Sequence, residues 1–165
     1  MLAGYGVTHV FMVPAVLRRT FAEMERRTKI ARVHCHGEKS AAYMADGYAR
    51  ASGKPGVCMA QVIGALNLAA GLRDAYLAHS PVLAFTGGRD PKTKFRKVYQ
   101  EVDDVPAFEP VTKMNATVDD VARIPDMVPY PTGYERVSRE RTSVNWASPA
   151  GFMITSEAPS AIACP

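Results

Sequence analysis

The sequence predicts a doubly wound α/β fold, with a mostly parallel sheet, helices on both faces and an incomplete C-terminal end. Between residues 7 and 88, short apolar runs of strand length alternate with segments whose apolar residues recur at helical spacing. Only a few residues connect one segment to the next, which favours parallel pairing through right-handed crossovers. The run at 55–63 is almost wholly apolar, as expected of a strand that is covered on both faces.

Four strands and three helices follow from this pattern. The predicted strands are residues 7–13, 30–35, 55–63 and 81–88. The first helix follows Pro14, and the other two are predicted at 39–52 and 65–77. Their inward faces are formed by Val16, Leu17, Phe21 and Met24 in the first helix, by Ala41, Ala42, Ala45, Tyr48 and Ala49 in the second, and by Leu68, Leu72, Ala75 and Tyr76 in the third.

Beyond residue 88 the regular pattern fades. Residues 89–110 are polar and interrupted by proline, which predicts a loop with a short helix, and residues 111–115 predict a strand. Thr117, with Asp120 three residues later, predicts the N-cap of a helix that runs to about Met127.

The last part of the chain differs in composition from the rest. Residues 129–165 have no sustained period and are rich in Pro, Ser and Thr, which predicts an irregular tail. We therefore expect one domain over residues 1–128, followed by a tail that is disordered or the product of a frameshift.

Composition and charge exclude several classes of protein. No stretch approaches the roughly 18 uninterrupted apolar residues of a membrane helix, and the N-terminus lacks a signal-peptide pattern, so a cytoplasmic protein is expected. The net charge of +4 comes from scattered basic pairs without interleaved aromatic residues, which argues against nucleic-acid binding. Cys35, Cys58 and Cys164 are too widely spaced for a CxxC motif or a disulfide framework.

Glu38 is the candidate functional residue because of where the fold places it. Ligands of open α/β sheets bind at the carboxyl ends of the strands, and Glu38 comes directly after the second predicted strand, at the start of a helix. Taken alone, it could equally be an ordinary acidic residue in a first helical turn. His34 and His36 lie nearby, but no further metal ligand is evident and no metal site is predicted.

The residues around Glu38 resemble a known family. The string EKSAAYMADGYARASGKPGVC, residues 38–58, is similar to the segment that carries the catalytic glutamate in thiamine-diphosphate enzymes of the acetolactate synthase type. GVTHVFMVPA (6–15), LNLAAGLRDAYLAHSPVLAFTG (66–87), YQEVDDV (99–105) and PVTKMN (110–115) resemble other parts of the same family. The resemblance covers about residues 4 to 128 and implies the pyrimidine-binding domain.

The resemblance implies a cofactor and a chemistry. In this family the glutamate carboxyl hydrogen-bonds a ring nitrogen of the cofactor's aminopyrimidine, whose imino tautomer removes the thiazolium proton, and the resulting ylide attacks a 2-keto acid. Glu38 would be the catalytic residue, and Pro14, Gly64 and Asn67 would join it in binding thiamine diphosphate. A single acidic residue would then be sufficient for this proton exchange, because its partner is the coenzyme.

The chain also departs from the family. Met12 and Ala15 stand where glycines usually flank Pro14, and the Ser-Gly-Pro-Gly turn after the third strand reads VIGA, which keeps Gly64. The family's diphosphate-binding domain with its Mg²⁺ ligands is absent, and so is a last strand of the type G-P-V-H-L. Loss of that strand would leave the fourth strand, 82–86, with an exposed edge.

Two classes of function remain open. One is part of a 2-keto acid decarboxylase or carboligase, inactive alone, which would obtain Mg²⁺ and diphosphate binding from a partner chain or a homo-oligomer. In that class the alanines of helix 39–52 would pack on the sheet and on a neighbouring subunit. The other is a non-catalytic remnant or a protein-interaction module of α/β fold.

Overall fold

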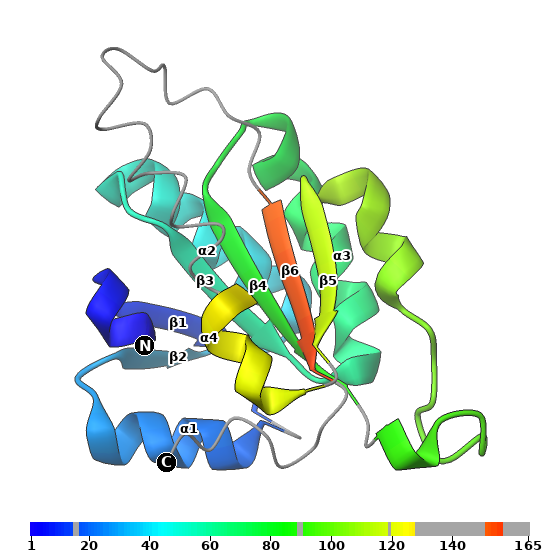
Figure 1. The fold of residues 1–165 in the computed structure, drawn as a ribbon. Coiled ribbons are helices and arrows are strands. Elements are labelled where there is room, and N and C mark those ends of the chain that lie inside the picture. The colour runs from blue at the N-terminus through cyan, green and yellow to red at the C-terminus, as the bar shows by residue number, and fades with distance from the viewer. Residues whose placement is uncertain (15–16, 89–90, 119, 128–150, 157–165) are drawn as a thin grey trace.

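The computed structural model describes residues 1–14, 17–88, 91–118, 120–127 and 151–156, and its centre is a parallel sheet. Six strands lie in the order β2-β1-β3-β4-β6-β5, and every neighbouring pair is parallel (Figure 1). The strands are β1 (His9–Met12), β2 (Ala31–His34), β3 (Gly56–Ala60), β4 (Val82–Gly87), β5 (Met114–Val118) and β6 (Gly151–Ser156).

Helices cover both faces of the sheet, as the fold-class prediction requires. The helices are α1 (Arg18–Arg27), α2 (Glu38–Ser52), α3 (Val62–Leu77) and the short α4 (Ile124–Met127). Four 3₁₀-helices accompany them, at Leu2–Tyr5, Pro91–Thr93, Val105–Val111 and Val121–Arg123. The doubly wound α/β fold is thereby confirmed.

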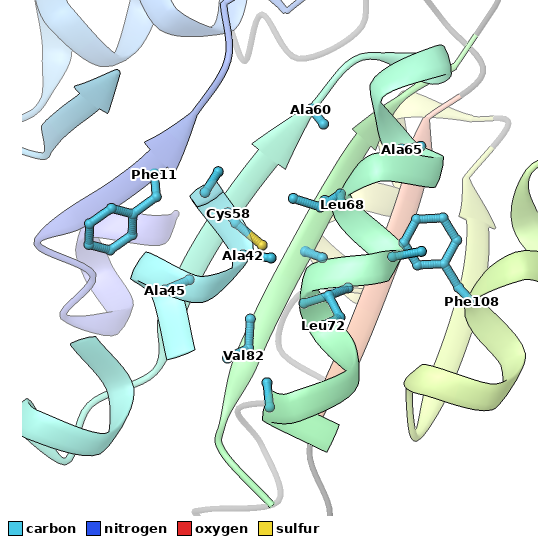
Figure 2. Close-up of a cluster of buried hydrophobic side chains, with 14 of the residues drawn as sticks. Phe11, Ala42, Ala45, Cys58, Ala60, Ala65, Leu68, Leu72, Val82 and Phe108 are labelled. Carbon is cyan, nitrogen blue, oxygen red and sulfur yellow. The ribbon is translucent and has the colours of Figure 1, made fainter. Parts of the chain in front are cut away.

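The first core layer lies between the sheet and the α2–α3 pair (Figure 2). The four alanines predicted to face inward on α2 are all buried there: Ala41, Ala42, Ala45 and Ala49. The small side chains allow α2 to approach β3 so closely that a Cβ at Gly56 would lie 2.7 Å from the carbonyl carbon of Ala45. These four alanines are covered by this chain itself, while packing of α2 on a neighbouring subunit stays a prediction.

The second core layer lies on the opposite face of the sheet. Along β1, β3 and β4, alternate residues point to this face, as the period of two in a strand requires. α1 and α4 cover it with Phe21, Met24 and Ile124, together with Leu17 at the N-cap of α1. All five residues of β3 are buried, which confirms the prediction of a strand covered on both faces.

The structure corrects the prediction that the final strand is missing. β6 lies between β4 and β5 and pairs with β4 over all six of its residues, from Gly151 opposite Val82 to Ser156 opposite Gly87. β4 therefore has neighbours on both sides, and the exposed edge expected at 82–86 does not exist. The remainder of the predicted tail, 129–150 and 157–165, lies outside the described residues.

The segment after the loop also differs in detail from its prediction. β5 extends to Val118, so Thr117 is a strand residue and not a helix N-cap. Asp120 is the actual cap: its Oδ1 accepts a hydrogen bond from the Ala122 backbone N–H at 2.9 Å, and the chain enters the 3₁₀-helix at Val121. Thr117 and Asp120 are the two residues that were expected to begin the helix. Thr117 instead continues strand β5, because β6 lies alongside it.

Candidate functional site

The strand order places a topological switch point at β1. β1 pairs with β2 on one side and with β3 on the other, so the next two strands in the sequence lie on opposite sides of β1 in the sheet. The chain after β1 leads to α1 on one face, whereas the chain after β3 leads to α3 on the other face. Open α/β sheets bind their ligands at the carboxyl ends of the strands at such a point.

Glu38 lies at this edge as the first residue of α2. The preceding Gly37 is extended, and the chain is held beside β1 by a hydrogen bond of 2.8 Å from the Cys35 N–H to the Met12 carbonyl. The Glu38 side chain is half-buried. The predicted position, at a helix start on the ligand edge, is what the structure shows.

Glu38 contacts two of the three residues that were predicted to share its site. Its Oε2 accepts a hydrogen bond from Nδ2 of Asn67 at 3.2 Å. Its carboxyl group also lies against Gly64, where a Cβ would come within 2.6 Å of the Glu38 carboxyl carbon. A Cβ at position 64 would displace the carboxylate from this place.

Pro14 is at the same edge but outside this contact. It is exposed at the end of β1, and the Val13 N–H before it bonds to the Met59 carbonyl of β3 at 3.4 Å. Met12, one of the departures from the family pattern, is buried in the second core layer. The other departure, Ala15, lies outside the described residues.

An ion pair between the buried Asp46 and the half-exposed Arg50 lies in the far half of α2. Nε and Nη2 of Arg50 donate to the two oxygens of Asp46 at 2.8 and 2.7 Å, and Nη2 also reaches the Asp74 carbonyl of α3 at 3.4 Å. The carboxylate of Asp46 holds the pKa of the Arg50 guanidinium above its usual value. On the same side of α2, a hydrogen bond to Asp74 raises the pKa of Tyr43, so that α2 and α3 are joined by polar groups as well as by packing.

The two cysteines that the structure describes are free. Cys58 is buried in β3, and burial raises the pKa of its thiol far above the ordinary range. Burial also raises the pKa of the Cys35 thiol, which lies between the end of β2 and α2, 3.4 Å from the Met44 sulfur. Neither environment favours a thiolate nucleophile.

The loop after β4 is organised by Glu101. Its carboxylate accepts the backbone N–H groups of Phe95 at 2.5 Å and of Val98 at 3.0 Å. Phe95, Lys97 and Gln100 have positive φ angles in this tight loop. Glu101 belongs to the segment 99–105 that resembles part of the family, and its carboxylate bonds within its own loop.

The described residues contain neither a metal-binding cluster nor a helix that could span a membrane. Within these ranges, no group of three or more His, Cys, Asp or Glu side chains is arranged to hold a metal ion, and His34 and His36 do not form one. In the same part of the chain, no helix combines the length and the apolar character needed to cross a bilayer.

Comparison with known proteins decides the family. The family described as "Thiamine pyrophosphate enzyme, N-terminal TPP binding domain" matches residues 1–107, which is more than half of the chain. The chain belongs to the thiamine pyrophosphate enzymes. The resemblance seen around Glu38 is thereby confirmed, and the matched part is the cofactor-binding domain at the N-terminus of these enzymes.

The similar relatives include acetolactate synthases. The chain is 36% identical over 129 residues to the acetolactate synthase of Bacillus subtilis (strain 168), covering 77% of this chain and 22% of that enzyme. It is 38% identical over 125 residues to acetolactate synthase 2, chloroplastic, of Nicotiana tabacum, covering 74% of this chain and 19% of the relative. The chain thus spans about a fifth of the length of these relatives.

Solved structures share the fold. A thiamin diphosphate-dependent enzyme from Mycobacterium smegmatis superposes with a TM-score of 0.77 at 23% identity, covering 98% of this chain and 29% of that one. The thiamine diphosphate-dependent 4-hydroxybenzoylformate decarboxylase of Rhodococcus jostii RHA1 gives 0.76 at 19% identity, with the same coverage. At this level of identity the likeness shows the architecture.

Sequence reasoning missed the close approach between α2 and α3. A Cβ at Gly71 would lie 2.6 Å from the backbone oxygen of Lys39 and 2.7 Å from the Cβ of Ala42. A glycine inside a helical period was the available signal, since glycine is unfavourable there unless packing requires it. Which residue it would meet could not be read from the sequence.

Proposed function

We propose that this chain binds the aminopyrimidine end of thiamine diphosphate through Glu38, as one half of the active site of an acetolactate synthase-like enzyme. The observation that carries the proposal is the Glu38 carboxylate itself. It lies at the switch point, rests on Gly64, and its one described hydrogen bond comes from an uncharged donor, the Asn67 amide. A carboxylate supported in this way remains available to a ligand nitrogen.

The residues present fit the cofactor. One oxygen of Glu38 is oriented by Asn67, and a carboxyl group can accept from or donate to a heterocyclic nitrogen. Gly64 leaves the space above the first turn of α3 to the carboxylate, and exposed Pro14 borders the same edge from β1. When bound, thiamine diphosphate supplies carbanion chemistry on a 2-keto acid. The role of Glu38 is to hold or exchange a proton at that ring nitrogen.

A partner would supply the other half of the site. The chain spans about a fifth of its acetolactate synthase relatives, so we propose that diphosphate and Mg²⁺ are bound by a further domain or by a second chain. Four large apolar side chains on α2 and α3 are between 41% and 47% exposed: Tyr43, Met44, Ile63 and Leu66. They lie on the same two helices as Glu38 and Asn67, which supports docking of that partner on the α2–α3 pair.

The substrate and the location follow from the relatives. Acetolactate synthases are the named relatives at 36% and 38% identity, which supports a 2-keto acid as the substrate of the complete enzyme. Location in the cytoplasm stays a prediction, because the name of the tobacco relative places that protein in the chloroplast.

Calorimetry tests the proposal. The chain is titrated with thiamine diphosphate and Mg²⁺, alone and after mixing with the C-terminal part of a related acetolactate synthase, and pyruvate consumption is followed in parallel. We expect no turnover from the chain alone and cofactor binding with turnover in the mixture.

A matched pair of variants assigns the role of Glu38. Glu38→Gln keeps the size of the side chain but loses the exchangeable proton, so turnover in the mixture should fall about 10²–10⁴-fold. Glu109→Gln makes the same change at an exposed position away from the site and should leave turnover unchanged. A Glu38→Gln mixture within a few-fold of wild type would refute the assignment, and failure of every mixture to bind cofactor would favour a non-catalytic module.

A further inference from the structure

We infer that Asn67 and Gly71 on α3 are positioning residues that fix Glu38, Asn67 through its side chain and Gly71 through the backbone of α2. The inference rests on the proposed function of Glu38 and deepens it. It also changes the predicted role of Asn67, which acts on Glu38 and not on the cofactor.

The spacing of these residues on α3 places them on one face. Gly64, Asn67 and Gly71 are at positions i, i+3 and i+7 of the helix, which is the spacing of residues that share a stripe. This stripe, Gly64–Asn67–Gly71, faces the first turn of α2: Gly64 and Asn67 meet the Glu38 side chain, and Gly71 meets Lys39 and Ala42. All the contacts fall on the start of α2, where Glu38 stands.

Gly71 determines how far the first turn of α2 lies from α3. An added Cβ would come within 2.6 Å of the Lys39 carbonyl oxygen, and a backbone oxygen cannot rotate away as the end of a flexible side chain can. Lys39 is the neighbour of Glu38, so any shift of this carbonyl moves the Glu38 backbone as well. Glycine is less favourable than alanine in the interior of a helix, and the close approach of α2 explains why position 71 is a glycine.

Asn67 determines the direction of the carboxylate. Its amide bonds to Oε2 at 3.2 Å while Gly64 lies beneath the carboxyl group, so the side chain is held from the side and from below. A long side chain at the start of a helix would otherwise exchange among rotamers. Misplacement of a reacting group by about 1 Å can cost on the order of 10²-fold in rate.

The first test compares two glycine-to-alanine substitutions in the full chain. Gly71→Ala introduces the contact with Lys39, whereas Gly47→Ala makes the same change at an exposed site of α2 where a Cβ would meet nothing within 4 Å. Backbone amide NMR shifts of Glu38 and Lys39 should change in Gly71→Ala and remain at their wild-type values in Gly47→Ala. Unchanged shifts in a folded Gly71→Ala chain would overturn the role of Gly71, whether or not the chain binds a cofactor.

The second test uses Asn67, whose exposed side chain should be replaceable without loss of the fold. Asn67→Ala removes the donor, and Asn67→Asp replaces it with a carboxylate that repels Glu38. Crystal structures of both variants should show the Glu38 carboxyl group away from Gly64, and Asn67→Asp should show the larger displacement. A carboxyl group that stays on Gly64 in both variants would overturn the inference.

Turnover in the mixture of this chain with the C-terminal part of a related acetolactate synthase adds a functional measurement. Turnover number should fall at least 10-fold in Gly71→Ala and Asn67→Ala, with the Michaelis constant for the keto acid within about twofold of wild type. Glu38→Gln separates the two proposals. If this substitution leaves turnover unchanged, the proposed function of Glu38 fails. The displacement of Glu38 in the Gly71 and Asn67 variants still decides whether these two residues position it. Wild-type turnover in both positioning variants, with an active Glu38-dependent enzyme, would contradict the inference.

Discussion

Replacement of Phe108 by alanine should remove a large part of the stability of this domain. Phe108 lies in the 3₁₀-helix Val105–Val111, is 0% exposed and is the largest of the fully buried side chains among the described residues. Its ring points toward α3, where it joins the cluster of Leu68 and Leu72 (Figure 2). This one side chain anchors the segment between the loop after β4 and strand β5 on the first core layer.

The expected loss follows from that burial. Truncation of a fully buried phenylalanine removes its transfer free energy and leaves a cavity, which together cost about 3–5 kcal/mol. The free energy of unfolding of a typical domain is about 5–15 kcal/mol, so the loss is about a fifth of it or more. At about 2–4 °C per kcal/mol for a domain of this size, the melting temperature should fall by roughly 10 °C.

Urea denaturation followed by circular dichroism provides the measurement, with Phe95→Ala as the matched control. Phe95 is 87% exposed, so the same substitution should change the free energy of unfolding by no more than about 0.5 kcal/mol. Equal effects of the two substitutions, or a loss below about 1 kcal/mol for Phe108→Ala, would refute the packing of the 105–111 segment described above.

Two further predictions concern the polar groups of α2 and the cysteines. Arg50→Ala leaves the buried carboxylate of Asp46 without its bidentate partner. Because Arg50 is half exposed and water can enter, we expect the free energy of unfolding in urea denaturation to fall by about 1–2 kcal/mol. An unchanged midpoint would show that the pair contributes nothing. Burial raises the pKa of Cys35 and so disfavours its thiolate. Alkylation of the folded chain should therefore be slow at neutral pH and should need a more alkaline solution than alkylation of the unfolded chain. Cys58 should not react until the chain unfolds, and peptide mapping that finds it alkylated in the native chain at pH 8 would contradict its burial.

Much of the fold could be predicted because its signals are local. The apolar periods of the first 88 residues assigned β1 to β4 and α1 to α3 to within a few residues, and the alanines of α2 were correctly placed inward. A period of two or 3.6 residues records which face of an element is buried, and this information lies within a few turns of chain. The same logic placed Glu38 at the ligand edge, since strand ends of a parallel sheet share one edge.

The features that the sequence did not reveal depend on contacts between distant segments. β6 is six residues long, and its position is specified by backbone hydrogen bonds to β4 and β5, which do not depend on side-chain identity. A short apolar run, Phe152 to Ile154 behind Gly151, was its only local signal. Such a strand resembles irregular chain until its neighbours are known.

For the site, the division is the same. The sequence by itself determined that an acid stands at the start of a helix on the ligand edge, and its resemblance to the family indicated the cofactor. Only the tertiary structure decided that Asn67, 29 positions away, donates to that acid, and that Gly64 and Gly71 let α2 and α3 meet around it. The physical reason is steric: a glycine tolerates close approach from any direction, and the folded chain alone determines which atoms occupy the space that its missing Cβ leaves.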